Sequence, residues 1–261
     1  MNWVIKTLSS SIGKKVTMSL TGLFLCSFLA VHLSGNLQLL KSDGGLAFNV
    51  YAVFMTTFPV IKFISYGLYA TILYHAIMGL YLANKNMASR KSKYAVAPGN
   101  ATSFWASRWM GVLGTIILVF IAVHMSDFWA EYHWGKVPYV QYEIDLNSGH
   151  TIATDTAVAP IEAKMQEIYT QTTKTIIVKD LNREVQGAFT NPLLVLLYTF
   201  AMGALAFHLV HGFKSAFQTL GINHNKYNGL INFLGVWVFG IIIPILFALI
   251  PVYIYAQHLT N

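Results

Sequence analysis

Two histidines lie in the middle of an apolar stretch that is long enough to cross a lipid bilayer. They are His208 and His211, in the run at residues 201–221. An ionisable side chain at membrane depth is costly, so it usually serves a function and needs a polar partner. A neutral imidazole can bind a metal ion or a haem iron through a ring nitrogen, and it can also donate a hydrogen bond to a neighbouring helix. Both kinds of chemistry are open to these two residues.

Three other apolar runs each carry one internal histidine. Residues 16–40 contain His32, residues 59–84 contain His75, and residues 108–129 contain His124. Four helices that each present an imidazole to a common interior can hold a metal or a haem between facing helices. The sequence therefore predicts a four-helix bundle that binds such a group.

The composition indicates an integral membrane protein. Hydrophobic residues make up 55% of the 261 residues and charged residues only 10%, whereas soluble domains have roughly 45–50% and about 25%. We expect an all-α fold in one membrane domain, residues 1–261. Its helices are predicted at about residues 16–40, 59–84, 108–129, 192–220 and 230–256. The last of these has no internal histidine and should lie at the periphery of the bundle.

Two other segments and one proline pair stand out from these helices. The first apolar run is longer than the core of a signal peptide, so we expect it to be retained as a helix. Residues 130–191 are too long for a simple connector and predict an extracytoplasmic loop or small subdomain. In it, Ile161, Met165 and Ile168 have helical spacing, while residues 175–178 favour a strand. Pro244 and Pro251 should bend the last helix.

The placement of charge predicts the orientation. With a cytoplasmic N-terminus and five crossings, ten of the basic residues fall on the inner side: Lys6, Lys14, Lys15, Lys85, Arg90, Lys91, Lys93, Arg108, Lys214 and Lys226. All ten acidic residues fall on the other side. This agrees with the rule that short cytoplasmic loops are rich in Lys and Arg, so we expect the N-terminus inside and the C-terminus outside. The net charge of +7 is thereby explained without nucleic acid.

The single cysteine limits how a haem could be held. Cys26 lies inside the first apolar run, so the chain has neither an internal disulfide nor a Cys-x-x-Cys-His motif for covalent haem attachment. Any haem must be bound by coordination and packing alone. We interpret Cys26 as a small apolar packing residue.

Counting along the helices gives the histidines of the first and third helices one depth. His32 is seventeen positions beyond Lys15, and His124 is sixteen beyond Arg108. At about 1.5 Å per residue, both lie roughly 25 Å from the inner edge.

The second and fourth helices run the opposite way, and their histidines share a second depth. His75 is ten positions before Lys85, and His211 is ten before Gly221, so both lie roughly 15 Å from the inner edge. This predicts two bis-histidine haem sites, His32 with His124 and His75 with His211. His208, one turn deeper on nearly the same face as His211, is the alternative ligand or a neighbouring hydrogen-bond donor.

Several short motifs add a family resemblance to this pattern. They are Ser9-Ser10-Ser11-Ile12-Gly13-Lys14-Lys15 leading into Thr21-Gly22-Leu23, then Val31-His32-Leu33, His75 with Gly79, Val123-His124, and His211-Gly212 followed by Ser215-Ala216-Phe217-Gln218. With them the chain resembles the cytochrome b subunit of the succinate dehydrogenase and fumarate reductase family. The likeness is to the single-polypeptide anchor with five helices and two b haems, and it covers all five helices.

The resemblance implies the function and the partners. A flavoprotein subunit would oxidise succinate or reduce fumarate, an iron–sulfur subunit would relay electrons, and this chain would exchange them with a quinone, of which menaquinone is favoured. Both partner subunits would lie on the inner side of a bacterial cytoplasmic membrane. This chain then carries no catalytic residue for the dicarboxylate, although the quinone site would lie in it. The direction of the reaction and a higher oligomer of the complex are left open.

The resemblance also implies further contacts. Ser19 matches a family position for binding a haem propionate, and Arg108 and Lys214 have the charge and depth to do the same. Asp127, one turn beyond His124, could exchange protons with a quinone near the outer haem, although a solvated acid at a helix end has the same pattern. Some family members have a glutamate in the fourth helix for proton movement, and this chain has no acid there.

Two alternatives remain from the sequence. The chain could be the cytochrome b anchor of another respiratory dehydrogenase, such as a hydrogenase or a formate dehydrogenase. It could also be a proton or metal transporter with histidines along a polar path, although such proteins usually have broken helices, inverted repeats or intramembrane acids.

Overall fold

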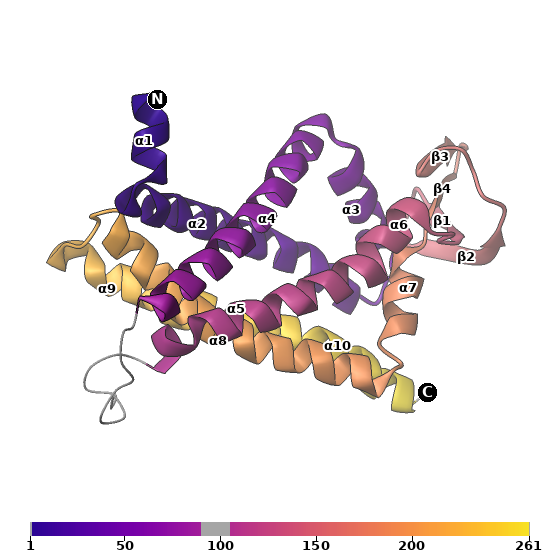
Figure 1. Ribbon diagram of the computed structural model, residues 1–261. Helices are drawn as coiled ribbons and strands as arrows, with labels where there is room; N and C mark the ends of the chain where they lie inside the picture. Colours follow the sequence, from indigo (N-terminus) through magenta and orange to yellow (C-terminus); the bar gives the residue numbers. More distant parts are fainter. Residues whose placement is uncertain (1, 90–104, 261) are drawn as a thin grey trace. The chain divides into compact units, whose positions relative to one another are not determined.

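The chain consists mainly of helices, with one small sheet (Figure 1). The computed structural model describes residues 2–89 and 105–260. Within these residues, five helical stretches are long and apolar enough to cross a membrane, as the sequence predicts: Ser11–Leu40, Pro59–Ala88, Trp105–Trp134, Pro192–Thr219 and Asn225–Thr260. The basic residues Arg90, Lys91 and Lys93, expected in an inner loop, lie outside the described residues.

The first span begins earlier than expected because a serine caps it. Helix α1 (Trp3–Ser9) precedes α2 (Ser11–Asn36), and a 3₁₀ turn, η1 (Leu37–Leu40), follows. The Ser10 hydroxyl accepts a hydrogen bond from the Gly13 N–H at 3.0 Å. A serine that accepts from the third residue of a helix satisfies one of the N–H groups left free at its start.

The second and third spans also extend beyond their expected ends. Helix α4 (Pro59–Ala88) has proline as its first residue, where the missing N–H costs nothing. The third span consists of α5 (Trp105–His124), a π-helical segment η2 (Met125–Ala130) and α6 (Glu131–Trp134).

The last two spans differ in regularity. Helix α8 (Pro192–Thr219) is continuous, whereas the fifth span divides into α9 (Asn225–Phe233), the π-helical segment η3 (Leu234–Ile242) and α10 (Ile243–Thr260). The π segment ends two residues before Pro244. A proline lacks the N–H of the i to i−4 ladder and clashes with the preceding turn, so a locally wider helix in front of it accommodates both defects.

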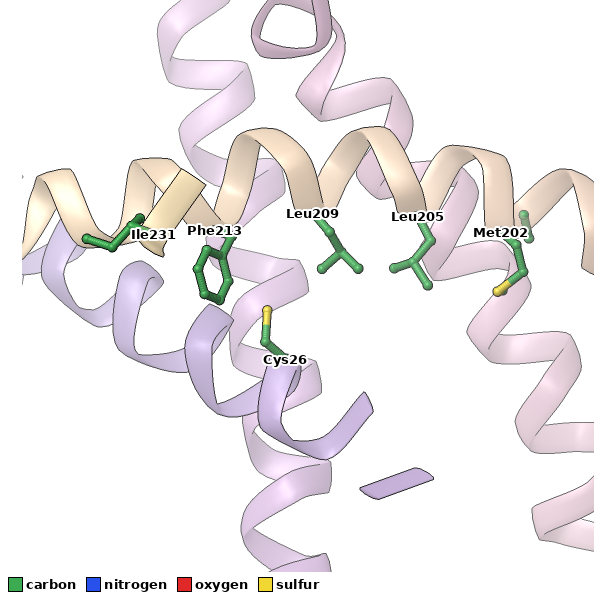
Figure 2. Packing of buried hydrophobic residues seen from close by; sticks show 7 residues of the cluster. Cys26, Met202, Leu205, Leu209, Phe213 and Ile231 are labelled. Atoms are coloured by element: carbon green, nitrogen blue, oxygen red, sulfur yellow. The ribbon is translucent and has the colours of Figure 1, made fainter. Parts of the chain in front are cut away.

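The described chain forms two compact units. The first comprises Met1–Val31, Tyr66–Ile121 and Leu197–Ala248. Its core is a stripe along α8 in which Ala201, Leu205, Leu209 and Phe213 recur every four residues, and Cys26 of α2 packs against them (Figure 2). Repetition at this interval places these side chains on one face of the helix. Cys26 is 5% exposed, as expected of a packing residue.

Many large apolar side chains point away from the cores. On α4, Phe63, Leu73 and Ile77 are exposed, and on α8 the same holds for Leu193 and Phe200. A water-soluble protein rarely leaves so much apolar surface uncovered. Contact with lipid accounts for it.

The second unit contains the sheet, so the prediction of an all-α fold was wrong. It comprises His32–Ser65, Ala122–Leu196 and Leu249–Asn261. Four antiparallel strands pair in the order β2-β1-β4-β3. The strands are β1 (Tyr139–Asp145), β2 (Thr151–Val158), β3 (Met165–Tyr169) and β4 (Thr173–Lys179).

The expected helical spacing around Met165 was misleading, whereas the expected strand at residues 175–178 is confirmed within β4. Met165 begins strand β3 instead of continuing a helix. Threonine and β-branched residues are dense in β2 and β4, and such residues favour strands because they fit a pleated surface. The pairing of β3 with β4 therefore outweighs a weak three-residue pattern.

The sheet packs against α3 (Leu46–Thr57), a helix too short to span, through apolar side chains such as Val53 and through one buried asparagine, Asn49. The Asn49 amide donates to the Tyr142 hydroxyl at 3.1 Å and to the Asp180 carboxylate at 2.9 Å, and its oxygen accepts from the Asn182 N–H at 2.8 Å. Tyr142 in turn donates to the Gly44 carbonyl at 2.9 Å. Asn49 and Tyr142 are each 0% exposed, so these bonds are shielded from water.

Asp180 also begins the helix that follows the sheet. Its carboxylate accepts from the Arg183 N–H at 3.1 Å and caps α7 (Leu181–Ala188). Asn49 therefore joins α3, the central strand β1 and the start of α7 at one buried point.

We predict that Asn49→Ala destabilises this second unit. The variant leaves the buried Asp180 carboxylate and the Tyr142 hydroxyl short of a donor, which should lower the local free energy of opening by about 2–4 kcal/mol. Hydrogen exchange of the amides in β1 and β4 measures this quantity. Asn147→Ala, in an exposed turn of the same sheet, is the control and should change it by less than about 0.5 kcal/mol. Equal effects of the two variants would contradict the role of Asn49.

We also predict a loss of stability at alkaline pH that depends on Tyr142. Burial raises the pKa of the Tyr142 phenol to about 12, so the fold favours the neutral form. The contribution to stability is complete below the ordinary tyrosine pKa of about 10, and it disappears as the pH rises from there through about 12. The same exchange measurement across this range should show the loss in the native chain and a smaller loss in Tyr142→Phe.

Candidate functional site: two histidine pairs

The first histidine pair lies in the second unit. His32 comes from the last turns of α2, and His124 is the final residue of α5. Their ring centroids are 5.7 Å apart, and the ring planes are nearly perpendicular at 86°. The Asn36 amide donates to the backbone carbonyl of His32 at 2.7 Å. The structure thus brings together the two residues expected to form the outer site.

The helix carrying His124 changes its geometry directly after this residue. The π segment Met125–Ala130 begins there, and π segments are frequent at functional sites because they change the direction in which side chains point. Within it, Phe128 lies with its ring 5.6 Å from that of His124. The Asp127 Oδ2 atom is buried, and within the part of the chain that the structure describes it has no hydrogen-bond partner. One of its two carboxylate oxygens is therefore shielded from water, although the residue as a whole is only half-buried.

The second pair lies in the first unit and consists of His75 and His208. His75 of α4 and His208 of α8 have ring centroids 6.4 Å apart and ring planes at 64°. The Thr21 hydroxyl oxygen lies 3.1 Å from Nδ1 of His75. The Nδ1 atom of His208 is buried and has no hydrogen-bond partner among the described residues.

The structure favours His208 over His211 as the residue opposite His75. Among the described residues it shows no ring contact between His211 and His75. The depth count used Lys85 and Gly221 as helix ends, but α4 continues to Ala88 and α8 ends at Thr219. From these ends, His75 is thirteen residues inward, His208 eleven and His211 eight. The corrected count pairs His75 with His208.

Small residues surround the second pair. A Cβ atom added to Gly22 of α2 would lie 3.4 Å from Cε1 of His75, and one added to Gly114 of α5 would lie 3.8 Å from Cε1 of His208. Around Gly212, beside His211, no atom lies within 4 Å of such a Cβ. Residues with little or no side chain allow a flat ligand to approach the backbone.

The spacing of both pairs fits two axial ligands of one metal. Two imidazoles on opposite faces of a metal have ring centroids roughly 6 Å apart, because each metal–nitrogen bond is about 2.0 Å long. The observed separations are 5.7 and 6.4 Å. A bare metal ion in a protein usually requires three or four side-chain ligands, and no group of three His, Cys, Asp or Glu residues converges in the described ranges. Two axial histidines are what a haem iron needs, so these residues fit haem better than a bare ion.

The three residues expected to bind haem propionates differ in their surroundings. Ser19 is buried, at 7% exposure, and its hydroxyl donates to the backbone carbonyl of Lys15 at 3.0 Å. It would have to give up this bond in order to donate to a carboxylate. The side chains of Arg108 and Lys214 are exposed.

The sequence interpretation overlooked Thr21 as a polar partner of a histidine and Gly114 as a residue beside one. A signal for Thr21 was present. It precedes His32 by eleven residues, which is close to three helical turns, so both side chains lie on the same face of α2.

Comparison with protein-family models, with curated proteins and with solved structures gave no match.

Proposed function

We propose that this chain is a membrane anchor with two b haems that transfers electrons between an iron–sulfur subunit and a membrane quinone. The enzyme would be a succinate dehydrogenase or fumarate reductase. One observation carries the proposal: four different apolar helices bring their histidines together in two pairs, with ring centroids 5.7 and 6.4 Å apart. The family motifs described above are the reason for naming succinate dehydrogenase or fumarate reductase as the enzyme.

In this proposal each pair of imidazoles binds one haem. His32 and His124 would hold one, and His75 and His208 would hold the other. When bound, each haem supplies reversible one-electron exchange at its iron. The residues contribute by binding through neutral ring nitrogens, since a ligating imidazole must be unprotonated on the atom that binds. The absence of a Cys-x-x-Cys-His motif requires both haems to be non-covalent.

Quinone chemistry also requires protons, and Asp127 is placed to handle them. Reduction of a quinone to a quinol consumes two electrons and two protons. Asp127 is three residues beyond His124, and its Oδ2 is buried and unpaired within the described part of the chain. A proton held at this oxygen is available to a quinone that binds beside the His32 and His124 pair.

The charge pattern supports the orientation and the site of docking. Lys14, Lys15 and Lys85 lie at the ends of their spans that the charge rule places in the cytoplasm, together with Lys214 and Lys226. The iron–sulfur and flavoprotein subunits would dock on this basic side, in a bacterial cytoplasmic membrane. The same rule assigns residues 130–191 to the outer side of the membrane.

Purification separates this proposal from the alternatives. A dithionite-reduced minus oxidised spectrum should show a b-type α-band, and a pyridine haemochrome assay should give two haems per chain. A transporter would show neither. The subunits that copurify identify the dehydrogenase: a hydrogenase or formate dehydrogenase would replace the flavoprotein. Oxidation of a menaquinol analogue by fumarate, catalysed by the intact complex, tests the quinone.

We predict that single histidine substitutions remove the haems in two groups. His32→Ala and His124→Ala should each remove one haem, while His75→Ala and His208→Ala should each remove the other. His211→Ala, on the same helix as His208, is the matched control and should retain both haems. Loss of haem in His211→Ala with retention in His208→Ala would instead restore His211 as the ligand.

A further inference from the structure

We propose that Thr21 is a positioning residue that fixes the tautomer of His75, with the ring proton on Nδ1, so that the lone pair of Nε2 would be available to a haem iron. The part of this inference that concerns iron rests on the proposed function. The tautomer itself depends only on the hydrogen bonds of the chain.

The bonds of the Thr21 hydroxyl determine the direction of its contact with His75. The hydroxyl donates to the carbonyl of Thr17 at 2.8 Å, with the carbonyl of Met18 at 3.1 Å as a second acceptor. A hydroxyl has one hydrogen and two lone pairs. Once its hydrogen is directed to the preceding turn, which is the usual arrangement for threonine inside a helix, Thr21 can only accept from His75.

The ring nitrogen must then be the donor. Nδ1 of His75 lies 3.1 Å from the Thr21 oxygen, so the contact forms a hydrogen bond if Nδ1 carries the proton. A neutral imidazole has a single N–H, and the hydrogen bond of one nitrogen sets which nitrogen can bind a metal. Nε2 of His75 is therefore left with a lone pair for a ligand.

The packing of α2 against α4 holds Thr21 in this position. Two further polar contacts link these helices: the Thr17 hydroxyl lies 2.7 Å from the Tyr74 hydroxyl, and the Lys14 ammonium donates to the Tyr81 hydroxyl at 3.3 Å. Gly22 next to Thr21 leaves the room that the His75 ring occupies. Contacts at positions 14, 17 and 21 recur every three to four residues, which places them along one face of α2.

The two imidazoles of this pair are consequently unequal. Nδ1 of His75 has an acceptor, whereas Nδ1 of His208 has no partner among the described residues. A hydrogen bond from the far nitrogen makes a ligating imidazole more basic and fixes its orientation. A more basic axial ligand stabilises the oxidised iron, so Thr21 should lower the reduction potential of the haem held by His75 and His208.

The first experiment compares three variants of the intact protein with haem bound. Thr21→Val keeps the shape and removes the acceptor, Thr21→Ser restores it, and Ser27→Ala removes an exposed hydroxyl from the same helix, where among the described residues it bonds only to the Leu23 carbonyl. Redox titration should show a raised potential for one haem in Thr21→Val, and haem affinity at that site should fall about tenfold. The other haem should be unchanged. Thr21→Ser and Ser27→Ala should both retain the native potential of the His75 haem.

The second experiment measures the tautomer without haem. The haem-free protein, labelled with ¹⁵N in its histidines, gives separate NMR signals for protonated and unprotonated ring nitrogens, and His75→Gln identifies the signals of His75. We expect a proton on Nδ1 in the native chain and a mixture of tautomers in Thr21→Val. A proton on Nε2 in the native chain would overturn the inference, as would an unchanged haem potential in Thr21→Val.

The two experiments also separate this inference from the proposed function. If the purified protein shows no haem α-band, the proposed function fails, and the NMR measurement still tests the tautomer. If the haems are present but Thr21→Val behaves like Ser27→Ala, the proposed function stands and the role of Thr21 fails.

Discussion

The need to satisfy imidazoles inside apolar helices organises this protein. A histidine within a membrane span loses its contacts with water, and the surrounding lipid offers no hydrogen bonds in return. The chain places the histidines of four spans in two pairs, with ring centroids 5.7 and 6.4 Å apart, and gives His75 a polar partner in the Thr21 hydroxyl. Gly22 and Gly114 leave space next to the rings of His75 and His208, and the apolar stripe of α8 packs the helix that carries His208. Helix packing therefore determines which imidazoles meet.

Hydropathy and histidine spacing were enough to predict the five spans and the pairing of His32 with His124 as neighbours. The transfer cost of polar groups into lipid is large, so an apolar stretch of this length leaves few alternatives to a helix. The sequence could not decide whether His208 or His211 faces His75, because the count of depth depended on where α4 and α8 end. Helix ends extend according to local capping and the adjoining loop, and an error of three residues moves a side chain by about 5 Å along the axis.

The sheet could not be derived from the same signals. Its strands are short, and β2 and β3 are largely exposed, so the alternation of apolar and polar residues that marks a half-buried strand is weak in both. Their stability comes from pairing with β1 and β4 and from the contact with α3, which are interactions between distant parts of the sequence. The same holds for Thr21, because its partner on another helix depends on how the two helices are rotated about their axes.

The Asn49 contact has a consequence for how the protein is made. Its three partners follow it in the chain by 93 to 133 residues, and two complete spans are synthesised in between. During translation the Asn49 amide therefore lacks these partners until the third span and the strands after it have been synthesised. The second unit is thus completed late. A ribosome stalled before Asp180 would leave a nascent chain with three spans synthesised and this unit still open.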